Sequence, residues 1–340
     1  MNYKKIGLMV ALILIIIAIG AAFAFSNNGK NAEGENGKIN IVTTTFATYD
    51  FAKQIAGDRA NVTFLMGPGV DTHGYDPSAG DLIKIQNADI FIYVGEEMEQ
   101  WVERVIDTLD TERTTLVKIS ELVEIIEEQE IEGVEHSHSH EEDEHDDDHE
   151  HEEDEHEEEE HAHEVELDEH VWSSPANAII VMEKLAKVFV KVDSENKEIY
   201  ETNGEKYVNE IKKLKADIQE IVDNKVRDRL IFGDKMPMQY FINEFGLQVS
   251  AAFTGCSTET EPSSSTVAYL INKVKEENLP VVLYIELSNG KIAQTISEET
   301  GAQMMQIQTL HNVTKKDFDS GETYVSLMTR NLEVLKKALQ

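Results

Sequence analysis

The sequence predicts an α/β protein with two Rossmann-like lobes, each built on a parallel sheet, joined by a long helical backbone. Short β-branched runs alternate with amphipathic helical stretches before residue 120 and again after residue 228, which is the pattern of βαβ units. Between the two series, residues 175–222 keep a helical period. A chain of 340 residues is also long enough for two lobes with their own cores.

The first series predicts an N-terminal lobe over residues 38–134. Its strands are expected at 38–44, 61–65, 89–94 and 115–119, and its helices at 46–56, 78–87 and 97–109. The first helix is expected to end at Gly57, because glycine is common just after the last helical turn.

The second series predicts a C-terminal lobe over residues 228–340. Its strands are expected at 230–232, 248–252, 281–285 and 304–307, and its helices at 237–245, 263–276, 291–299 and 322–339. Residues 168–227 supply a loop and the linking helices, with Ser174 as a helix cap, Pro175 in the first turn, and interruptions near 193–194 and 203–204. In such proteins a ligand cleft opens at the carboxyl ends of the strands.

Residues 1–37 predict a signal or membrane anchor followed by a polar linker. Lys4 and Lys5 precede an uncharged apolar run over 6–25, which is long enough to span a bilayer and also offers a small-residue cleavage site. The positive flank places the rest of the chain outside the cytoplasm, either secreted or anchored to the outer face of the membrane. Cys256 is the only cysteine, which excludes an intramolecular disulfide, a multi-cysteine zinc site and a lipid attached to a cysteine after the apolar run.

Residues 135–167 form a segment of histidines and acids that we expect to be a disordered loop. Nine of the twelve histidines lie here, and we predict that they collect metal: His136, His138, His140, His145, His149, His151, His156, His161 and His163. Residues 121–169 contribute −27 to the net charge of −36, and so few apolar side chains cannot offset the entropy of ordering. The alternative is a solubilising acidic loop. This charge also excludes nucleic acid as a partner.

The three remaining histidines, His73, His170 and His311, all lie in loops, and two of these loops directly follow predicted strands. A single loop histidine is usually solvated. Three histidines at the positions where α/β proteins form ligand sites instead predict a folded metal site, because neutral imidazole is the commonest side-chain ligand for zinc-like metals.

Two motifs resemble a known family. Residues 67–77, GPGVDTHGYDP, and residues 168–175, DEHVWSSP, with a His/acid-rich segment before the second, are similar to the metal-binding solute-binding proteins of ABC importers for zinc and manganese. The resemblance covers about residues 38–340. It implies one metal held in the cleft between the lobes and handed to a membrane permease, with His73 and His170 as ligands from the N-terminal lobe.

The C-terminal lobe departs from the family pattern at the position where a third His or a Glu is usual. Residues 233–241 read GDKMPMQYF, so Asp234 is the nearest candidate, one residue out of register, and it also suits a helix cap. Glu286 follows a strand at a fourth family position and is a second weak candidate for a metal ligand. The alternative is that Glu286 is an acid on the surface at the end of a strand. His311 could supply the missing imidazole.

We expect Zn²⁺ rather than Mn²⁺, because three imidazoles and a histidine-rich loop suit zinc, whereas manganese sites favour oxygen ligands. The predicted function is an extracytoplasmic, monomeric receptor that delivers Zn²⁺ to an ABC importer permease and its ATPase. The alternatives are a manganese receptor of the same family, or a surface zinc buffer or adhesin acting through the loop. An enzyme is not expected, because neither His-Glu-x-x-His nor Gly-x-Ser-x-Gly occurs.

Overall fold

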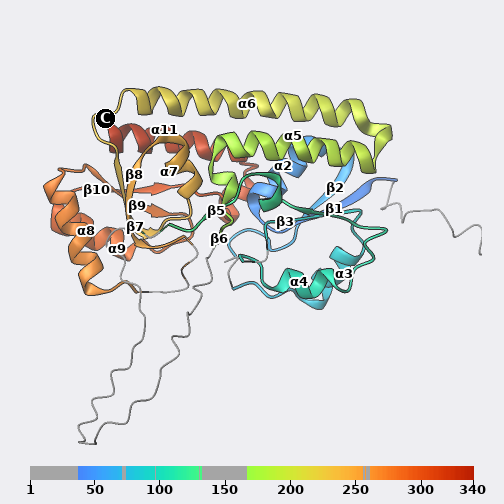
Figure 1. Cartoon of the computed structure of the whole chain (residues 1–340), viewed down its shortest axis with the longest axis horizontal. Coiled ribbons are helices and arrows are strands. Elements are labelled where there is room, and N and C mark those ends of the chain that lie inside the picture. The colour runs from blue at the N-terminus through green and yellow to red at the C-terminus, as the bar shows by residue number, and fades with distance from the viewer. Residues whose placement is uncertain are drawn as a thin grey trace, which may run out of the picture.

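The computed structural model describes residues 37–70, 74–95, 97–129, 131, 167–255, 257 and 261–340. Within them the chain forms two α/β lobes, each with a four-stranded parallel sheet, lying side by side along a pair of long helices (Figure 1). The predicted fold class is confirmed. The apolar run 6–25, His73, Cys256 and the nine histidines of 136–163 lie outside the described residues. None of the helices in the described part has the length and apolar content needed to span a bilayer.

The N-terminal lobe is built on a sheet in the order β2-β1-β3-β4. Its strands are β1 (Ile39–Thr43), β2 (Ala60–Phe64), β3 (Ile90–Tyr93) and β4 (Thr115–Lys118), and its helices are α2 (Phe46–Ala56), α3 (Ala79–Gln86) and α4 (Trp101–Ile106). All four residues of β3 are buried, as expected of a central parallel strand covered on both faces. Helix α4 is shorter than the predicted helix over 97–109.

The C-terminal lobe is built on a sheet in the order β10-β9-β7-β8. Its strands are β7 (Arg229–Lys235), β8 (Gln248–Phe253), β9 (Val281–Ile285) and β10 (Gln303–Ile307). Its helices are α7 (Gln239–Phe245), α8 (Ser264–Glu276), α9 (Lys291–Thr300), α10 (Lys315–Asp319) and α11 (Tyr324–Leu339). A Cβ atom on Gly233 would lie 2.4 Å from Cα of Ala293, so this glycine lets α9 pack directly against the backbone of β7. Helix α10 was not predicted.

Helices α5 (Pro175–Val192) and α6 (Lys197–Asp223), joined by a short 3-10 turn η3 (Ser194–Asn196), form the backbone between the lobes. Ser174 caps α5 and Pro175 occupies its first turn, as predicted. Helix α6 runs along both lobes (Figure 1) and contacts α2, α5 and α11. The predicted interruption at 203–204 is wrong, because α6 is continuous there. Gly204 is buried against Ala186 of α5, where a Cβ atom would lie 3.2 Å from the alanine Cβ, so it serves close helix packing.

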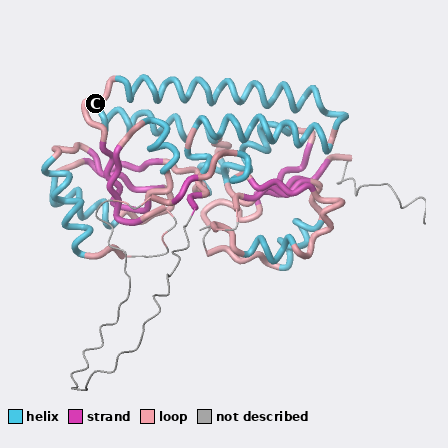
Figure 2. The backbone as a smooth tube through the Cα atoms, viewed as in Figure 1, coloured by secondary structure: helices cyan, strands magenta, loops and turns pink. Residues whose placement is uncertain are grey.

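A two-stranded antiparallel ribbon, β5 (Ile126–Glu127) with β6 (Leu167–Asp168), lies between the lobes (Figure 2). Sequence reasoning did not find it, because its pairing joins residues on either side of the long acidic segment. The side chain of Gln239 on α7 accepts from the backbone N–H of Gln129 and donates to the carbonyl of Glu127. The ribbon is therefore fixed to the C-terminal lobe.

A buried carboxyl group ties the lobes to the backbone. Asp50 on α2 is 4% exposed and accepts hydrogen bonds from the Tyr207 hydroxyl of α6, at 2.5 Å, and from the Tyr324 N–H of α11, at 2.8 Å. Gln54 donates to its other oxygen. Burial raises the pKa of Asp50 above its usual range. One side chain thus connects helices from the N-terminal lobe, the backbone and the C-terminal end of the chain.

Replacing Tyr207 by Phe should lower the free energy of unfolding by about 1.5–3 kcal/mol, because the buried carboxyl group of Asp50 loses a donor. Urea denaturation with an unchanged m-value would measure the loss. Tyr49→Phe is the matched control, since its phenol makes no hydrogen bond recorded among the described residues, and it should cost less than about 0.5 kcal/mol. Equal losses in the two variants would contradict the role given to Asp50.

Candidate metal centre

His170 is held by a carboxylate two residues before it. Asp168, at the end of β6, accepts from the backbone N–H of His170 at 2.8 Å, and the same oxygen lies 2.8 Å from the ring Nδ1. A carboxylate can only accept, so Nδ1 carries the proton and Nε2 keeps the lone pair that a metal requires. The imidazole is fully buried. Sequence reasoning missed Asp168, although residues i and i+2 of an extended segment face the same side, which is a readable signal.

Glu169 fixes the same segment to the N-terminal lobe. Its carboxylate accepts from the Met98 N–H at 2.8 Å and lies against Gly95, where a Cβ atom would come within 1.6 Å of it. A side chain at Gly95 would therefore displace the Glu169 carboxylate. The neighbouring Glu99 is fully buried, and burial, with the Glu169 charge as a smaller cause, raises its pKa to about 8. Glu99, from the turn after β3, and Glu169, from the His170 segment, are therefore neighbouring acids where the segment meets the N-terminal lobe.

Glu286, just after β9, holds the loop that carries His311. One of its carboxylate oxygens accepts from the Thr309 N–H, and the other accepts from the Thr309 hydroxyl and the Leu310 N–H, each at 2.8 Å. Leu310 has a φ of 64°, an unfavourable left-handed conformation for leucine that surrounding contacts must maintain. Burial raises the pKa of Glu286 to about 7. In this arrangement Glu286 positions His311, and metal coordination by Glu286 itself stays a prediction.

The structure brings His170 and His311 together. Their ring centroids lie 5.2 Å apart and the rings are nearly perpendicular. Trp172, in the 3-10 turn η2 (Val171–Ser173), donates from its indole N–H to the Thr309 carbonyl at 3.0 Å and packs its ring near that of His311. The indole therefore ties the His170 segment to the His311 loop.

The His311 loop also binds the N-terminal lobe. Asn312 donates from its side chain to the carbonyls of Gly67 and Val70, at 3.1 and 2.6 Å, and the Gly69 N–H donates to the Val313 carbonyl at 2.9 Å. His73 lies outside the described residues. The residues on either side of that gap, Val70 and Gly74, both line the cleft described next. His73 belongs to the gap between these two residues, and its role as a metal ligand stays a prediction.

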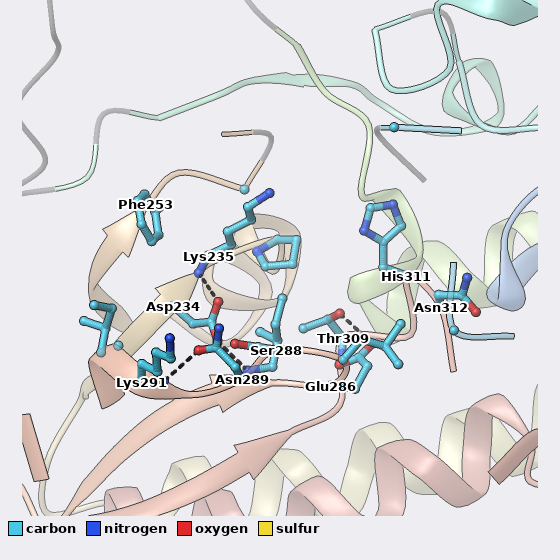
Figure 3. Close-up of a pocket in the computed structure, with 18 of the residues that line it drawn as sticks. Asp234, Lys235, Phe253, Glu286, Ser288, Asn289, Lys291, Thr309, His311 and Asn312 are labelled. Carbon is cyan, nitrogen blue, oxygen red and sulfur yellow. Dashed lines mark hydrogen bonds between the residues drawn. The ribbon is translucent and has the colours of Figure 1, made fainter. Parts of the chain in front are cut away.

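A cleft of about 620 Å³ opens between the lobes (Figure 3). Asp234, Glu286 and His311 line it together with Lys235. Asp234 lies in β7 and accepts from the N–H groups of Lys235 and Ile285, at 2.9 and 3.4 Å. It does not cap α7, which begins at Gln239 after Met238, so that interpretation is wrong because β7 continues further than predicted. Coordination of a metal by Asp234 stays a prediction.

His311, Asp234 and Glu286 line one cleft, and the buried His170 packs against His311, although these residues come from distant parts of the sequence. Among the residues that the structure describes, no three His, Cys, Asp or Glu side chains are grouped as ligands for one metal ion. A complete set that includes His73 stays a prediction, as does metal collection by the nine histidines of 136–163.

Comparisons with known proteins agree on one family for this chain. The family model described as zinc-uptake complex component A, periplasmic (ZnuA), matches residues 41–338. The zinc-binding lipoprotein AdcA of Streptococcus pneumoniae (strain ATCC BAA-255 / R6) is 32% identical over 334 residues, which is 98% of this chain and 61% of the relative. The high-affinity zinc uptake system protein ZnuA of Bacillus subtilis (strain 168) is 31% identical over 319 residues, 94% of this chain and 93% of the relative. The chain thus spans about three fifths of the pneumococcal protein.

Solved structures agree with this family assignment. The Zn(II)-bound ZnuA-like domain of Streptococcus pneumoniae AdcA superposes with a TM-score of 0.69 at 30% identity, covering 89% of this chain and 99% of that one. The metal-dependent lipoprotein YcdH from Bacillus subtilis gives a TM-score of 0.70 at 28% identity over 89% of this chain and 99% of that one.

The raised pKa of Glu286 predicts a pH-dependent stability. The folded state favours the neutral carboxyl group, so its contribution is complete below about pH 4.5 and is lost as the pH rises through about 7. Between pH 5 and 8 the metal-free protein should therefore lose about 1–3 kcal/mol of unfolding free energy relative to Glu286→Gln, which cannot ionise. Urea denaturation across this range measures the difference. The exposed Glu299→Gln should follow the wild type, and a Glu286→Gln curve parallel to the wild type would contradict the prediction.

Proposed function

Because the chain belongs to the family of periplasmic zinc-uptake components, we propose that it is an extracytoplasmic receptor that captures Zn²⁺ in the interlobe cleft and delivers it to an ABC-type permease and its ATPase. The family is one of solute-binding receptors rather than enzymes. The metal is the cargo of this protein and undergoes no bond chemistry in it. We expect the receptor to act as a monomer.

The observation that carries this proposal is the approach of His170 and His311. Their rings lie 5.2 Å apart, centroid to centroid, and Asp168 binds Nδ1 of the buried His170, so that Nε2 keeps its lone pair. A histidine whose second nitrogen is bound to a carboxylate is the common arrangement of a metal ligand. With His73 from the loop between Val70 and Gly74, the set would contain three imidazoles, which suits tetrahedral zinc.

We propose zinc rather than manganese as the metal because the expected ligands are imidazoles. Three nitrogen ligands favour zinc, whereas manganese sites favour oxygen, and the two acids of the cleft, Asp234 and Glu286, already accept hydrogen bonds from the backbone. The relatives in Streptococcus pneumoniae and Bacillus subtilis are named as zinc-binding and zinc-uptake proteins. The manganese and surface-buffer alternatives have no comparable support.

We propose that the histidine-rich segment raises the local metal concentration at the cleft. Its described ends meet in the β5–β6 ribbon, and β6 ends at Asp168, the carboxylate that holds His170. A cation attracted by the acids of the segment is thus released next to a site residue. We also propose that residues 6–25 direct export or anchor the chain; the only cysteine, Cys256, lies far from this run, so no lipid is attached to a cysteine there.

The proposal is tested by calorimetric zinc titration, with manganese as competitor, of the full chain and of a variant lacking residues 136–163. The deletion variant should bind one zinc tightly, and His73→Ala and His170→Ala should each lose that site. Affinity should fall as imidazoles protonate near pH ~6.5. In the full chain, His151→Ala serves as the control and should keep the tight site. Loss of all tight binding on deletion of the segment would instead favour a surface buffer.

Asp168→Asn should weaken zinc binding in the deletion variant about 10- to 100-fold, because the amide is a poorer partner for His170 Nδ1–H than the carboxylate. Competition with a chelator of known affinity measures the change. Asp223→Asn, at the end of α6 and away from the cleft, is the control and should bind as the parent does. A change of less than about threefold in Asp168→Asn would show that this carboxylate does not tune the ligand.

A further inference from the structure

We propose that two buried tyrosines, Tyr240 and Tyr324, are positioning residues for metal binding, and that they clamp the backbone on either side of His170. Tyr240 binds the carbonyl two residues before this histidine, and Tyr324 binds the carbonyl two residues after it. This role rests on the proposed function, because the quantity that the clamp would set is the affinity for zinc. Each tyrosine acts through a neighbouring residue and does not itself touch the metal.

The segment around His170 is too short to fix its own conformation. His170 has backbone angles φ −77° and ψ 46°, outside the ranges of regular helices and strands, and the 3-10 turn η2 that follows it contains three residues. Within this turn the Ser173 N–H donates to the His170 carbonyl at 3.0 Å. A single 3-10 turn has poor hydrogen-bond geometry. Contacts from other elements must therefore hold the imidazole in place.

Tyr240 of α7 supplies the first half of the clamp. Its hydroxyl donates to the Asp168 carbonyl at 2.6 Å and accepts from the Ile126 N–H at 3.1 Å, so it holds both strands of the β5–β6 ribbon. The side chain is buried, and burial raises the pKa of this phenol far above its usual range, which keeps the proton that it donates. Because the Asp168 carboxylate binds Nδ1 of His170, fixing the Asp168 backbone also fixes the partner of the imidazole.

Tyr324, the first residue of α11, supplies the second half of the clamp. Its hydroxyl donates to the Trp172 carbonyl at 2.9 Å, while its backbone N–H donates to the buried Asp50 carboxylate at 2.8 Å. The ring is fully buried and packs against Phe51, with centroids 5.0 Å apart, so the phenol is itself held firmly. Trp172 in turn donates from its indole N–H to the Thr309 carbonyl. The Tyr324 hydroxyl therefore also supports the loop after β10.

The clamp comes from one lobe, and the segment that it holds also binds the other lobe. Helices α7 and α11 belong to the C-terminal lobe (Figure 1), whereas the Glu169 side chain accepts from the Met98 N–H of the N-terminal lobe. Neither tyrosine occurs among the described residues that line the cleft, so neither is placed to be a ligand. A metal ligand keeps a productive orientation only when packing and hydrogen bonds around it lock its position. The two hydroxyls meet that requirement for His170.

The test is competition for zinc between the full chain and a chelator of known affinity, following the one tight zinc that His170→Ala loses. Tyr240→Phe and Tyr324→Phe remove only a hydroxyl, and each should raise the Kd of that zinc at least about threefold. The double variant should raise it at least about tenfold, because the two hydroxyls hold different carbonyls.

Tyr200→Phe is the matched control. The Tyr200 side chain is also buried and donates from its hydroxyl to the Asp193 carboxylate at 2.6 Å, but it does not line the described cleft. This variant should keep the Kd within about threefold of the wild type although it loses a buried hydrogen bond. Urea denaturation establishes that each variant is folded under the conditions of the competition, and if Tyr324→Phe does not fold, Tyr240→Phe alone decides.

A double-mutant cycle separates positioning from a general loosening of the fold. Tyr240 acts through Asp168, so Tyr240→Phe should change the Kd less than about threefold once Asp168→Asn is present. An equal effect in both backgrounds, an unchanged Kd in the folded tyrosine variants, or an equal loss in Tyr200→Phe would overturn the clamp alone. Absence of a His170-dependent zinc in the wild type would overturn the proposed function itself.

Discussion

The candidate site depends on how one loop of the C-terminal lobe, residues 308–313, is held between the two lobes. Glu286 accepts a hydrogen bond from this loop within the C-terminal lobe, and Trp172 donates one to it from the His170 segment. Asn312, which belongs to the loop, donates to the N-terminal lobe. Leu310 is kept in a left-handed conformation by these contacts, at a cost of about 1–3 kcal/mol. The position of the His311 imidazole is therefore set by long-range hydrogen bonds, and loosening any one of them would move this side chain.

The helical backbone gives this loop a stable frame. Helix α6 contacts helices of both lobes, and Asp50 joins α2, α6 and α11 through buried hydrogen bonds. A continuous helix bends sharply only where its hydrogen-bond ladder is interrupted, and α6 has no interruption over its 27 residues. This construction favours a fixed arrangement of the two lobes along the helical backbone.

Charge is distributed unevenly around the cleft. The histidine-rich acidic segment begins and ends at the β5–β6 ribbon, next to the carboxylate that holds His170. The opposite wall carries Lys235 and Lys291. Two buried acids, Glu99 in the N-terminal lobe and Glu286 at the cleft, have raised pKa values because the interior disfavours their charged forms.

The sequence alone determined the two-lobed α/β class, the helix over Phe46–Ala56 with its end at Gly57, and the start of α5 at Ser174 and Pro175, because hydrophobic period and capping act over a few neighbouring residues. It also placed His170 and His311 in loops. Only the tertiary structure decided that Glu286 holds the His311 loop, that Asp234 lies in a strand, that Gly204 is a packing position inside α6 and that β5 pairs with β6. Each of these depends on contacts between residues far apart in the chain, and local patterns carry no record of which distant segment will become a neighbour.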